Sequence, residues 1–163
     1  ETHGRQPSVL TQPANICRVE SDPLFQRIQT IDLTMVKRKL MDKNEGKGWS
    51  QEEADAIEVR YKRYLYMTTI DTDHPVVPTR DVDAFWHQHI LDTRAYASDC
   101  KRVFGKFLHH FPYLGMRGEE DLKLLERSFA QTCNLYRSLF DEEHEGDAVN
   151  CTGSDCGSRC CDG

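Results

Sequence analysis

Hydrophobic residues recur every three or four positions in the first third of the chain, which is the period of an amphipathic helix. Leu33, Val36 and Leu40 follow this spacing. Asp22 and Pro23, just ahead of a hydrophobic run, are typical of a helix start. We therefore predict helical segments between Asp22 and about Leu40.

The clearest helix start lies at Ser50. Glu53 follows it three positions later, a capping-box arrangement in which each side chain binds the backbone N–H of the other residue. This helix is predicted to reach about Ile70, and its apolar stripe comprises Ala54, Ile57, Tyr61, Tyr64 and Leu65.

Two prolines, Pro75 and Pro78, follow this helix and predict an extended connector over residues 71–78. Thr79 can then cap a helix predicted from about Arg80 to Ala97. One face of that helix is apolar apart from His89, and its other members are Val82, Phe85, Trp86, Ile90, Thr93 and Ala97.

Two more helical segments are predicted towards the C-terminus. One should end at Phe111–Pro112, because the residue before a proline is disfavoured in the helical region. Its apolar face comprises Val103, Phe104, Phe107 and Leu108. The last helix is predicted from about Glu119 to Glu142, with apolar positions at Leu122, Leu125, Phe129, Cys133, Tyr136 and Phe140.

No segment of the sequence alternates polar and apolar residues, and no hairpin signal lies between β-rich runs. The predicted fold class is therefore all-α, an irregular array of about five helices with an extended N-terminal arm and a cysteine-rich C-terminal tail. We expect the arm over residues 1–20, the helical domain over 21–143, and an acidic and then cysteine-rich tail over 144–163.

Charge and composition narrow the functional classes. The 163 residues include 21 Lys or Arg and 27 Asp or Glu, a formal net charge of −6, which is the wrong sign for a protein that follows phosphate backbones. No run approaches the ~20 apolar residues that a membrane helix needs. We therefore expect neither nucleic acid nor a membrane span, but a protein partner or self-association. No signal-peptide pattern is present, which favours the cytoplasm unless a leader was removed before Glu1.

Four of the seven cysteines crowd the C-terminal tail, at Cys151, Cys156, Cys160 and Cys161. Their spacing matches neither a CxxC pair nor an iron–sulfur ligand string. Reduced, they would form a soft-metal tail for Cu(I) or zinc. Oxidised, they would form disulfides within the tail or a tether to Cys17 or Cys133.

Four of the seven histidines lie in the segment 83–113, beside aspartate, tyrosine and cysteine residues. These residue types can ligate transition metals, and the candidate ligands are His87, His89, Cys100, His109 and His110. On a regular helix His87 and His89 project about 200° apart, so they cannot chelate one ion together. His87 shares a face with Asp83, whereas His89 faces the core.

Two interpretations of these histidines stay open. If the second helical segment continues through His110, a buried His89 and a buried His110 could meet across a helix pair, and Cys100 could complete a three-ligand site for zinc or copper. Alternatively, the histidines are core residues hydrogen-bonded to neighbouring aspartates or to Tyr96. Spacing alone favours this structural network over a metal site, with acid–base catalysis as a third alternative.

Several short motifs carry a resemblance to a known family. They include Val77–Pro78–Thr79, Trp86–His87–Gln88–His89, Tyr96, Asp99–Cys100, Phe104–Gly105 and His109–His110–Phe111–Pro112–Tyr113. Over about residues 31–115 the chain resembles the glycine-rich domain-containing protein-like family of bacteria, fungi and plants. The resemblance implies a helical domain of unassigned biochemistry, and it brings no established catalytic residues. The tail here departs from the family's glycine-rich tails in being short and poor in glycine.

Three hypotheses for function follow. The first is a non-enzymatic helical metal-binding or interaction domain with a His/Cys cluster and a cysteine-rich tail. The second is a small metal-dependent enzyme in which histidines and either Cys100 or Asp92 hold the ion. The third is a structural subunit of an assembly that is cross-linked through the tail cysteines.

Overall fold

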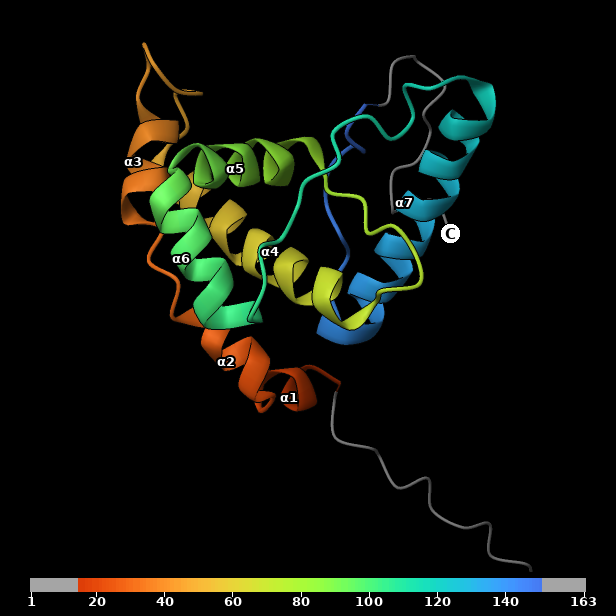
Figure 1. Ribbon diagram of the computed structural model, residues 1–163, viewed down its shortest axis with the longest axis horizontal. Coiled ribbons are helices and arrows are strands. Elements are labelled where there is room, and N and C mark those ends of the chain that lie inside the picture. Colours follow the sequence, from red (N-terminus) through yellow and green to blue (C-terminus); the bar gives the residue numbers. More distant parts are fainter. Residues whose placement is uncertain (1–14, 151–163) are drawn as a thin grey trace, which may run out of the picture.

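The computed structural model describes residues 15–150, which form helices and no β-strand (Figure 1). The helices are α1 (Asn15–Glu20), α2 (Pro23–Gln29), α3 (Thr34–Met41), α4 (Gln51–Ile70), α5 (Arg80–Leu91), α6 (Thr93–Phe104) and α7 (Glu119–Phe140). The predicted all-α class is confirmed. The tail cysteines, Cys151, Cys156, Cys160 and Cys161, lie outside the described residues, so the predicted disulfide or soft-metal tail stays a prediction.

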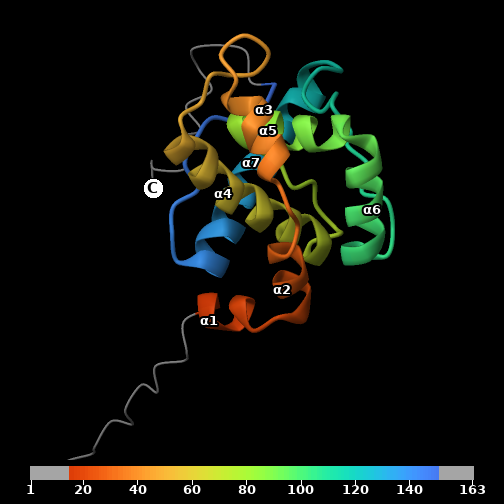
Figure 2. The same cartoon turned by 90° about the vertical axis from the view of Figure 1, so that its left-hand side faces the viewer.

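Helix α4 lies at the centre of the fold, with α2, α3 and α5 packed around it (Figures 1 and 2). Its predicted start is confirmed. The Ser50 hydroxyl accepts a hydrogen bond from the Glu53 N–H at 3.1 Å, and the Glu53 carboxylate accepts one from the Ser50 N–H at 2.8 Å. Tyr61, Leu65 and Met67 are fully buried, so α4 supplies much of the main core.

Helices α5 and α6 replace the single helix predicted over residues 80–97, so that prediction is wrong. Asp92 lies between them with a non-helical ψ of 73°, and its carboxylate accepts a hydrogen bond from the Ala95 N–H at 3.4 Å. The break lets α6 fold back against α5. Trp86 of α5 and Tyr96 of α6 thereby meet, and the Trp86 indole N–H donates to the Tyr96 hydroxyl at 3.0 Å.

Helix α6 ends at Phe104, so the predicted continuation to Phe111 is also wrong. Gly105 has a φ of 73°, in the left-handed region that commonly ends helices. The 105–118 loop then crosses from α6 to α7 in Figure 1. His110 therefore comes from a loop and not from a helix face.

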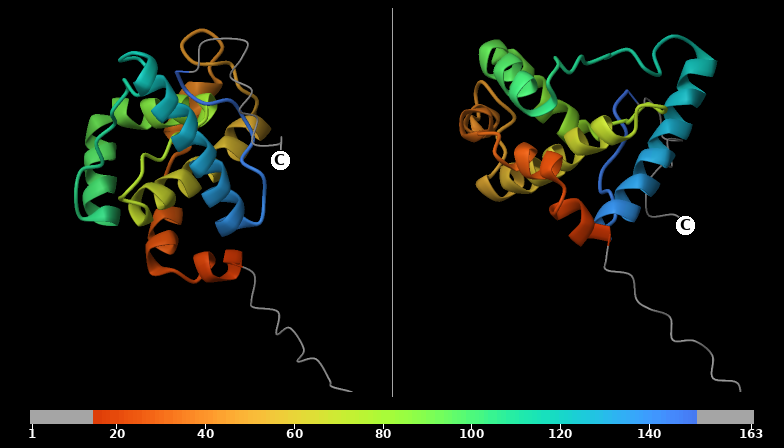
Figure 3. Two further views of the ribbon diagram at one scale, coloured as in Figure 1. Left: turned by 90° about the vertical axis from the view of Figure 1, so that its right-hand side faces the viewer. Right: turned by 60° about the horizontal axis from the view of Figure 1, so that its bottom comes forward.

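Helix α7 rests on α1 and on a smaller second core, whose buried members are Val77, Leu125, Phe129, Cys133 and Ala148. The C-terminal strap, residues 141–150, returns beside α7 (Figure 3). Thr79 and Ala148 form an antiparallel bridge, and the Asn150 side chain donates to the carbonyls of Pro112 and Leu114. The strap thus ties the 71–79 connector to the 105–118 loop.

The helical body extends further at both ends than residues 21–143, the range expected from the sequence. Residues 15–20, expected in an irregular arm, form α1 because they pack on α7. Residues 144–150, expected at the start of the tail, contribute the buried side chains of His144 and Ala148. None of the described helices is both long enough and apolar enough to cross a membrane.

Candidate metal centre

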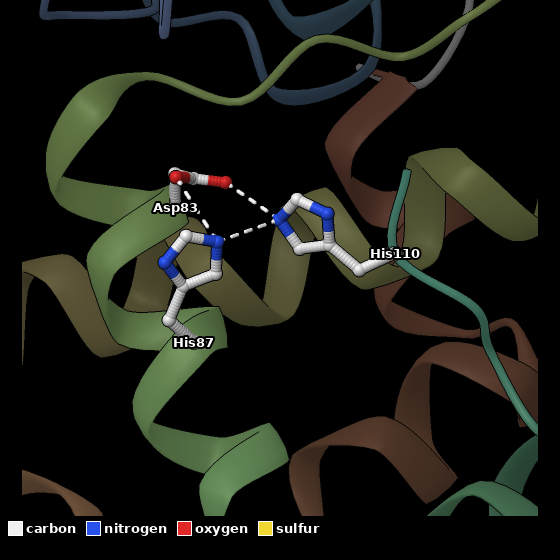
Figure 4. A group of neighbouring side chains, drawn as sticks. All are labelled: Asp83, His87 and His110. Atoms are coloured by element: carbon white, nitrogen blue, oxygen red, sulfur yellow. Dashed lines mark hydrogen bonds and ion pairs between the residues drawn. The ribbon is translucent and has the colours of Figure 1, made fainter. Parts of the chain in front are cut away.

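Asp83, His87 and His110 converge on one point, and we call them the histidine–aspartate cluster (Figure 4). His110 Nε2 lies 2.8 Å from Asp83 Oδ1 and 2.9 Å from His87 Nε2. His87 Nε2 lies 3.4 Å from Asp83 Oδ2. Among the His, Cys, Asp and Glu side chains of residues 15–150, these are the three whose ligand atoms lie close enough together to share a metal ion.

Two elements bring the cluster together. Asp83 and His87 lie four residues apart on α5 and share a face, as predicted. His110 is supplied by the 105–118 loop. The Asp83 side chain is buried at 9% exposure and that of His110 is 13% exposed, whereas the His87 side chain is 50% exposed. The cluster is therefore closed on the core side and open on the side of His87.

A second layer of residues holds His110 in place. The Trp86 ring stacks on the His110 ring, with centroids 4.1 Å apart and an angle of 27° between the planes. The Tyr96 hydroxyl donates to the Leu108 carbonyl at 2.5 Å and anchors the loop two residues before His110. Burial raises the pKa of Tyr96, so its hydroxyl keeps the proton that it donates. The loop conformation thus depends on the contact between α5 and α6.

Neutral histidines can satisfy the short contacts of the cluster only by sharing one proton. A neutral imidazole carries one N–H, and a hydrogen bond needs one donor and one acceptor. If His110 Nε2 donates to Asp83, it can reach the lone pair of His87 Nε2 only by sharing the same proton in a three-centre hydrogen bond. If His87 donates to His110 instead, His110 turns a lone pair towards the carboxylate. A cation at the centre removes this conflict, because all three atoms then present lone pairs to it.

The separations of the three atoms also lie close to those between metal ligands. Zinc binds histidine nitrogen and carboxylate oxygen at about 2.0–2.2 Å, which places two ligands about 3.0 Å apart at 90° and about 3.4 Å apart at 109°. Of the observed separations, 3.4 Å equals the tetrahedral spacing, whereas 2.8 and 2.9 Å lie just below the 90° spacing, so His110 would move outward to bind a tetrahedral ion. Three protein ligands on one side leave further positions open, as in catalytic zinc sites.

The outer support of His110 differs from the usual pattern. A metal-bound histidine normally donates a hydrogen bond from its second ring nitrogen. His110 Nδ1 is buried without such a partner among the described residues. The stacked Trp86 ring fixes the plane of the imidazole, but the Nδ1–H of a metal-bound His110 would have no acceptor among the described residues.

A pocket of ≈520 Å³ opens beside the cluster. Its walls come from the 71–79 connector, the 105–118 loop, α7 and the C-terminal strap. The apolar lining includes Val76, Val77, Pro78, Leu108, Leu114 and Leu124, and all three cluster residues also line it. The volume lies within the range of about 300–1,000 Å³ that is typical of small-molecule sites. We call it the apolar pocket.

His89 belongs to a separate, buried network. Its Nδ1 lies 2.8 Å from the Tyr61 hydroxyl and its Nε2 lies 3.0 Å from Asp99 Oδ2. Burial lowers the pKa of His89, and the Asp99 carboxylate partly opposes this shift. His89 faces the core as predicted, but its partners are Tyr61 and Asp99 and not His110.

The other predicted ligands lie away from the cluster. Cys100 is buried in the main core at 1% exposure. His109 is exposed and packs on the Phe107 ring at 4.9 Å. Asp92 is exposed and caps α6. Of the five candidate ligands, the structure thus joins His87 and His110.

Asp83 completes the cluster, although it was absent from the set of predicted ligands. The four-residue spacing from Asp83 to His87 was the signal for it, because that spacing places both side chains on one helix face. No such signal connects either residue with His110. Their meeting depends on where α6 ends and on the path of the loop that follows.

The fold and the site define a class, namely an all-helical protein in which helix α5 and the 105–118 loop carry a histidine–aspartate cluster beside a pocket. The chain matches the UCP032817-like family over residues 26–144 and belongs to it.

Two relatives from Arabidopsis thaliana extend this result. The chain is 33% identical to "Glycine-rich domain-containing protein 1" over 85 residues, which are 50% of this chain and 10% of the relative. It is 36% identical to "Glycine-rich domain-containing protein 2" over 89 residues, which are 52% of this chain and 11% of that relative. The resemblance seen in the sequence is thus confirmed, while the chain matches only about a tenth of either relative. No solved structure matches the chain significantly.

Proposed function

We propose that this domain binds a divalent transition-metal ion through Asp83, His87 and His110. One observation carries the proposal. Three ligand atoms from α5 and the 105–118 loop converge at 2.8–3.4 Å, an arrangement that neutral histidines satisfy only with one shared proton.

Zinc is the metal that we place there first. Two imidazoles and one carboxylate form a set that zinc commonly uses. The same set, with open positions, also binds iron(II) in non-haem oxygenases, which makes iron(II) the main competitor. Cu(I) prefers thiolate ligands, and Cys100 lies in the core and not in the cluster. Copper is therefore less favoured than zinc for this site.

Titration calorimetry of zinc into chelator-treated protein tests the proposal. We expect one zinc per chain, and an affinity at least about 100-fold weaker in the Asp83→Asn and His110→Ala variants, since loss of a direct ligand should exceed the 10- to 100-fold cost of losing an outer-shell partner. His109→Ala is the matched control. It removes the neighbouring imidazole, which is exposed and outside the cluster, and should bind zinc like the original protein.

Asp83→Asn nearly preserves the shape of the side chain, so circular dichroism should show an unchanged fold. Equal zinc binding by Asp83→Asn, His110→Ala and the unaltered protein would refute the cluster as the site. In that case, a variant ending at Asn150 would show whether the metal is held by the tail cysteines.

A metal-dependent enzyme is the second candidate, favoured by the apolar pocket beside the open side of the cluster. In this version Asp83, His87 and His110 hold the ion, because Cys100 and Asp92 both lie elsewhere in the fold. An assembly cross-linked through the tail cysteines is a third alternative, and it concerns residues outside those described.

A further inference from the structure

The polar side chains of the apolar pocket are already engaged within the protein. The Tyr64 hydroxyl donates to the Val76 carbonyl at 3.1 Å, and the Thr68 hydroxyl donates to the Leu65 carbonyl at 2.8 Å. The Asn150 amide donates to two carbonyls of the 105–118 loop. These lining groups therefore have little hydrogen-bonding capacity left for a bound molecule.

The charged residue on the pocket wall is also compensated. The Arg117 guanidinium pairs with Asp121 at 2.8 Å and lies over the Phe111 ring at 4.8 Å. Its charge is thus partly balanced by a carboxylate and an aromatic face, although the guanidinium is 57% exposed. Besides the exposed His109 and the outer Nη1 group of Arg117, the cluster is the polar feature of the described lining that is still open to a ligand.

Charge at the cluster selects the head group of that ligand. A divalent ion bound by one aspartate and two neutral histidines keeps a net charge of +1, with coordination positions open. An anionic oxygen donor would neutralise this charge and fill those positions. Without the metal, the buried Asp83 carboxylate would repel the same anion.

We propose that the apolar pocket binds a small monocarboxylate with an apolar body, whose carboxylate completes the coordination of the metal at Asp83, His87 and His110. This inference rests on the proposed metal site. The body of the ligand would lie against Val77, Leu114 and Leu124, where burial of apolar surface supplies most of the affinity.

Calorimetric titration of octanoate into zinc-loaded protein tests this inference, with acetate and 1-octanol as matched probes. Acetate has the head group without the body, and 1-octanol has the body without the charge. We expect octanoate to bind at least about 10-fold more tightly than either probe, and at least about 10-fold more weakly after zinc is removed with a chelator.

A pair of variants on α7 locates the body of the ligand. Leu124→Trp fills part of the pocket at a half-buried helix position, and it should weaken octanoate binding about 10-fold while zinc affinity is retained. Gln131→Trp introduces the same side chain at an exposed position of α7 outside the pocket, and should bind octanoate like the original protein.

The two proposals fail in different ways. Zinc is first titrated into the protein without any carboxylate ligand. If zinc does not bind at the cluster in this titration, both proposals are overturned. If zinc binds in an Asp83-dependent manner but octanoate binds no more tightly than acetate, the pocket inference alone is overturned. Octanoate binding that is insensitive to Leu124→Trp, or equal in zinc-free protein, also overturns it.

Discussion

Tyr96 connects the helix packing to the histidine–aspartate cluster. Its hydroxyl accepts from the Trp86 indole and donates to the Leu108 carbonyl. Trp86 stacks on His110, and Leu108 lies two residues before it. The hydrogen bonds of the Tyr96 hydroxyl go to Trp86 and Leu108 and not to the three candidate ligands, so its effect on the metal would act through the position of His110.

We predict that Tyr96→Phe weakens zinc binding about 10-fold, comparable to the loss of an outer-shell partner. Stability should fall by about 1–2 kcal/mol, because the Leu108 carbonyl and the Trp86 N–H lose a partner. Calorimetry and urea unfolding measure the two effects.

Tyr66→Phe is the control for this prediction. This substitution removes the 2.7 Å hydrogen bond from the Tyr66 hydroxyl of α4 to the Asp22 carboxylate ahead of α2. Neither residue belongs to the cluster. The variant should lower stability by a similar amount and leave zinc affinity unchanged. If both variants bind zinc like the original protein, Tyr96 has a structural role only.

Because His144 in the C-terminal strap is buried, we predict that the stability of the protein depends on pH. Its ring is 1% exposed and stacks on Tyr136 at 4.4 Å, and both ring nitrogens are buried without a hydrogen-bond partner among the described residues. Burial and the nearby Arg60 charge lower the pKa of His144 from 6.5 to about 4, and Asp81 partly opposes this shift. The folded protein therefore keeps this histidine neutral.

The sign of the effect follows from proton linkage. Between about pH 6.5 and pH 4 the unfolded chain binds a proton that the folded chain does not, so stability is complete above pH 6.5 and falls as pH decreases. The loss should reach at most about 3 kcal/mol near pH 4.

Urea unfolding of metal-free protein at several pH values tests this prediction. His144→Phe keeps an aromatic ring against Tyr136 and should lose this part of the pH dependence. The difference between the two stability curves isolates His144 from other titrating groups, including His89. Parallel curves would show that His144 does not contribute.

At the scale of elements, the end of α6 decides where His110 lies. Gly105 has a φ of 73°, and a Cβ built there would meet no atom within 4 Å. The cost of a side chain at this position is therefore conformational and not steric. We predict that Gly105→Ala destabilises the protein by about 1 kcal/mol, because only glycine adopts this region without strain.

Thermal or urea unfolding measures this loss, and Gly105→Asn is the matched variant. Asparagine tolerates the left-handed region better than alanine does, so it should cost less. An alanine variant as stable as the original protein would mean that α6 can end in another way.

Local signals predicted most of the helices but not their breaks. The start of α4 was readable because Ser50 and Glu53 cap the helix with their own side chains. The break at Asp92 was missed, because the apolar period continues across it. Folding α6 back on α5 buries Trp86 and Tyr96 against each other, and this tertiary gain outweighs the local preference for a continuous helix.

At the scale of the whole molecule, the cluster connects two parts of the chain that are 27 residues apart. A metal bound there would cross-link α5 to the 105–118 loop, which the C-terminal strap also contacts. Metal binding should therefore stabilise the folded body as a whole, because the unfolded chain does not keep the three ligands together.

We predict that zinc at 100 times its dissociation constant stabilises the protein by about 2.7 kcal/mol, as mass action requires for one site. Differential scanning calorimetry should show a higher melting temperature with zinc than with chelator. Asp83→Asn should show no such difference, whereas His109→Ala should keep it. A zinc effect of equal size in Asp83→Asn would place the stabilising metal elsewhere.

The sequence by itself determined the helical class, the capped start of α4, the buried face of His89 and the pairing of Asp83 with His87. Each depends on residues within about one helix turn of one another, whose relative positions follow from the helical period. Only the tertiary structure decided that His110 joins them and that Cys100 does not. That outcome depends on the breaks at Asp92 and Gly105 and on the Trp86–Tyr96 contact. Asp92 and Gly105 are local cap residues, but the direction that the chain takes after each of them depends on packing between distant segments.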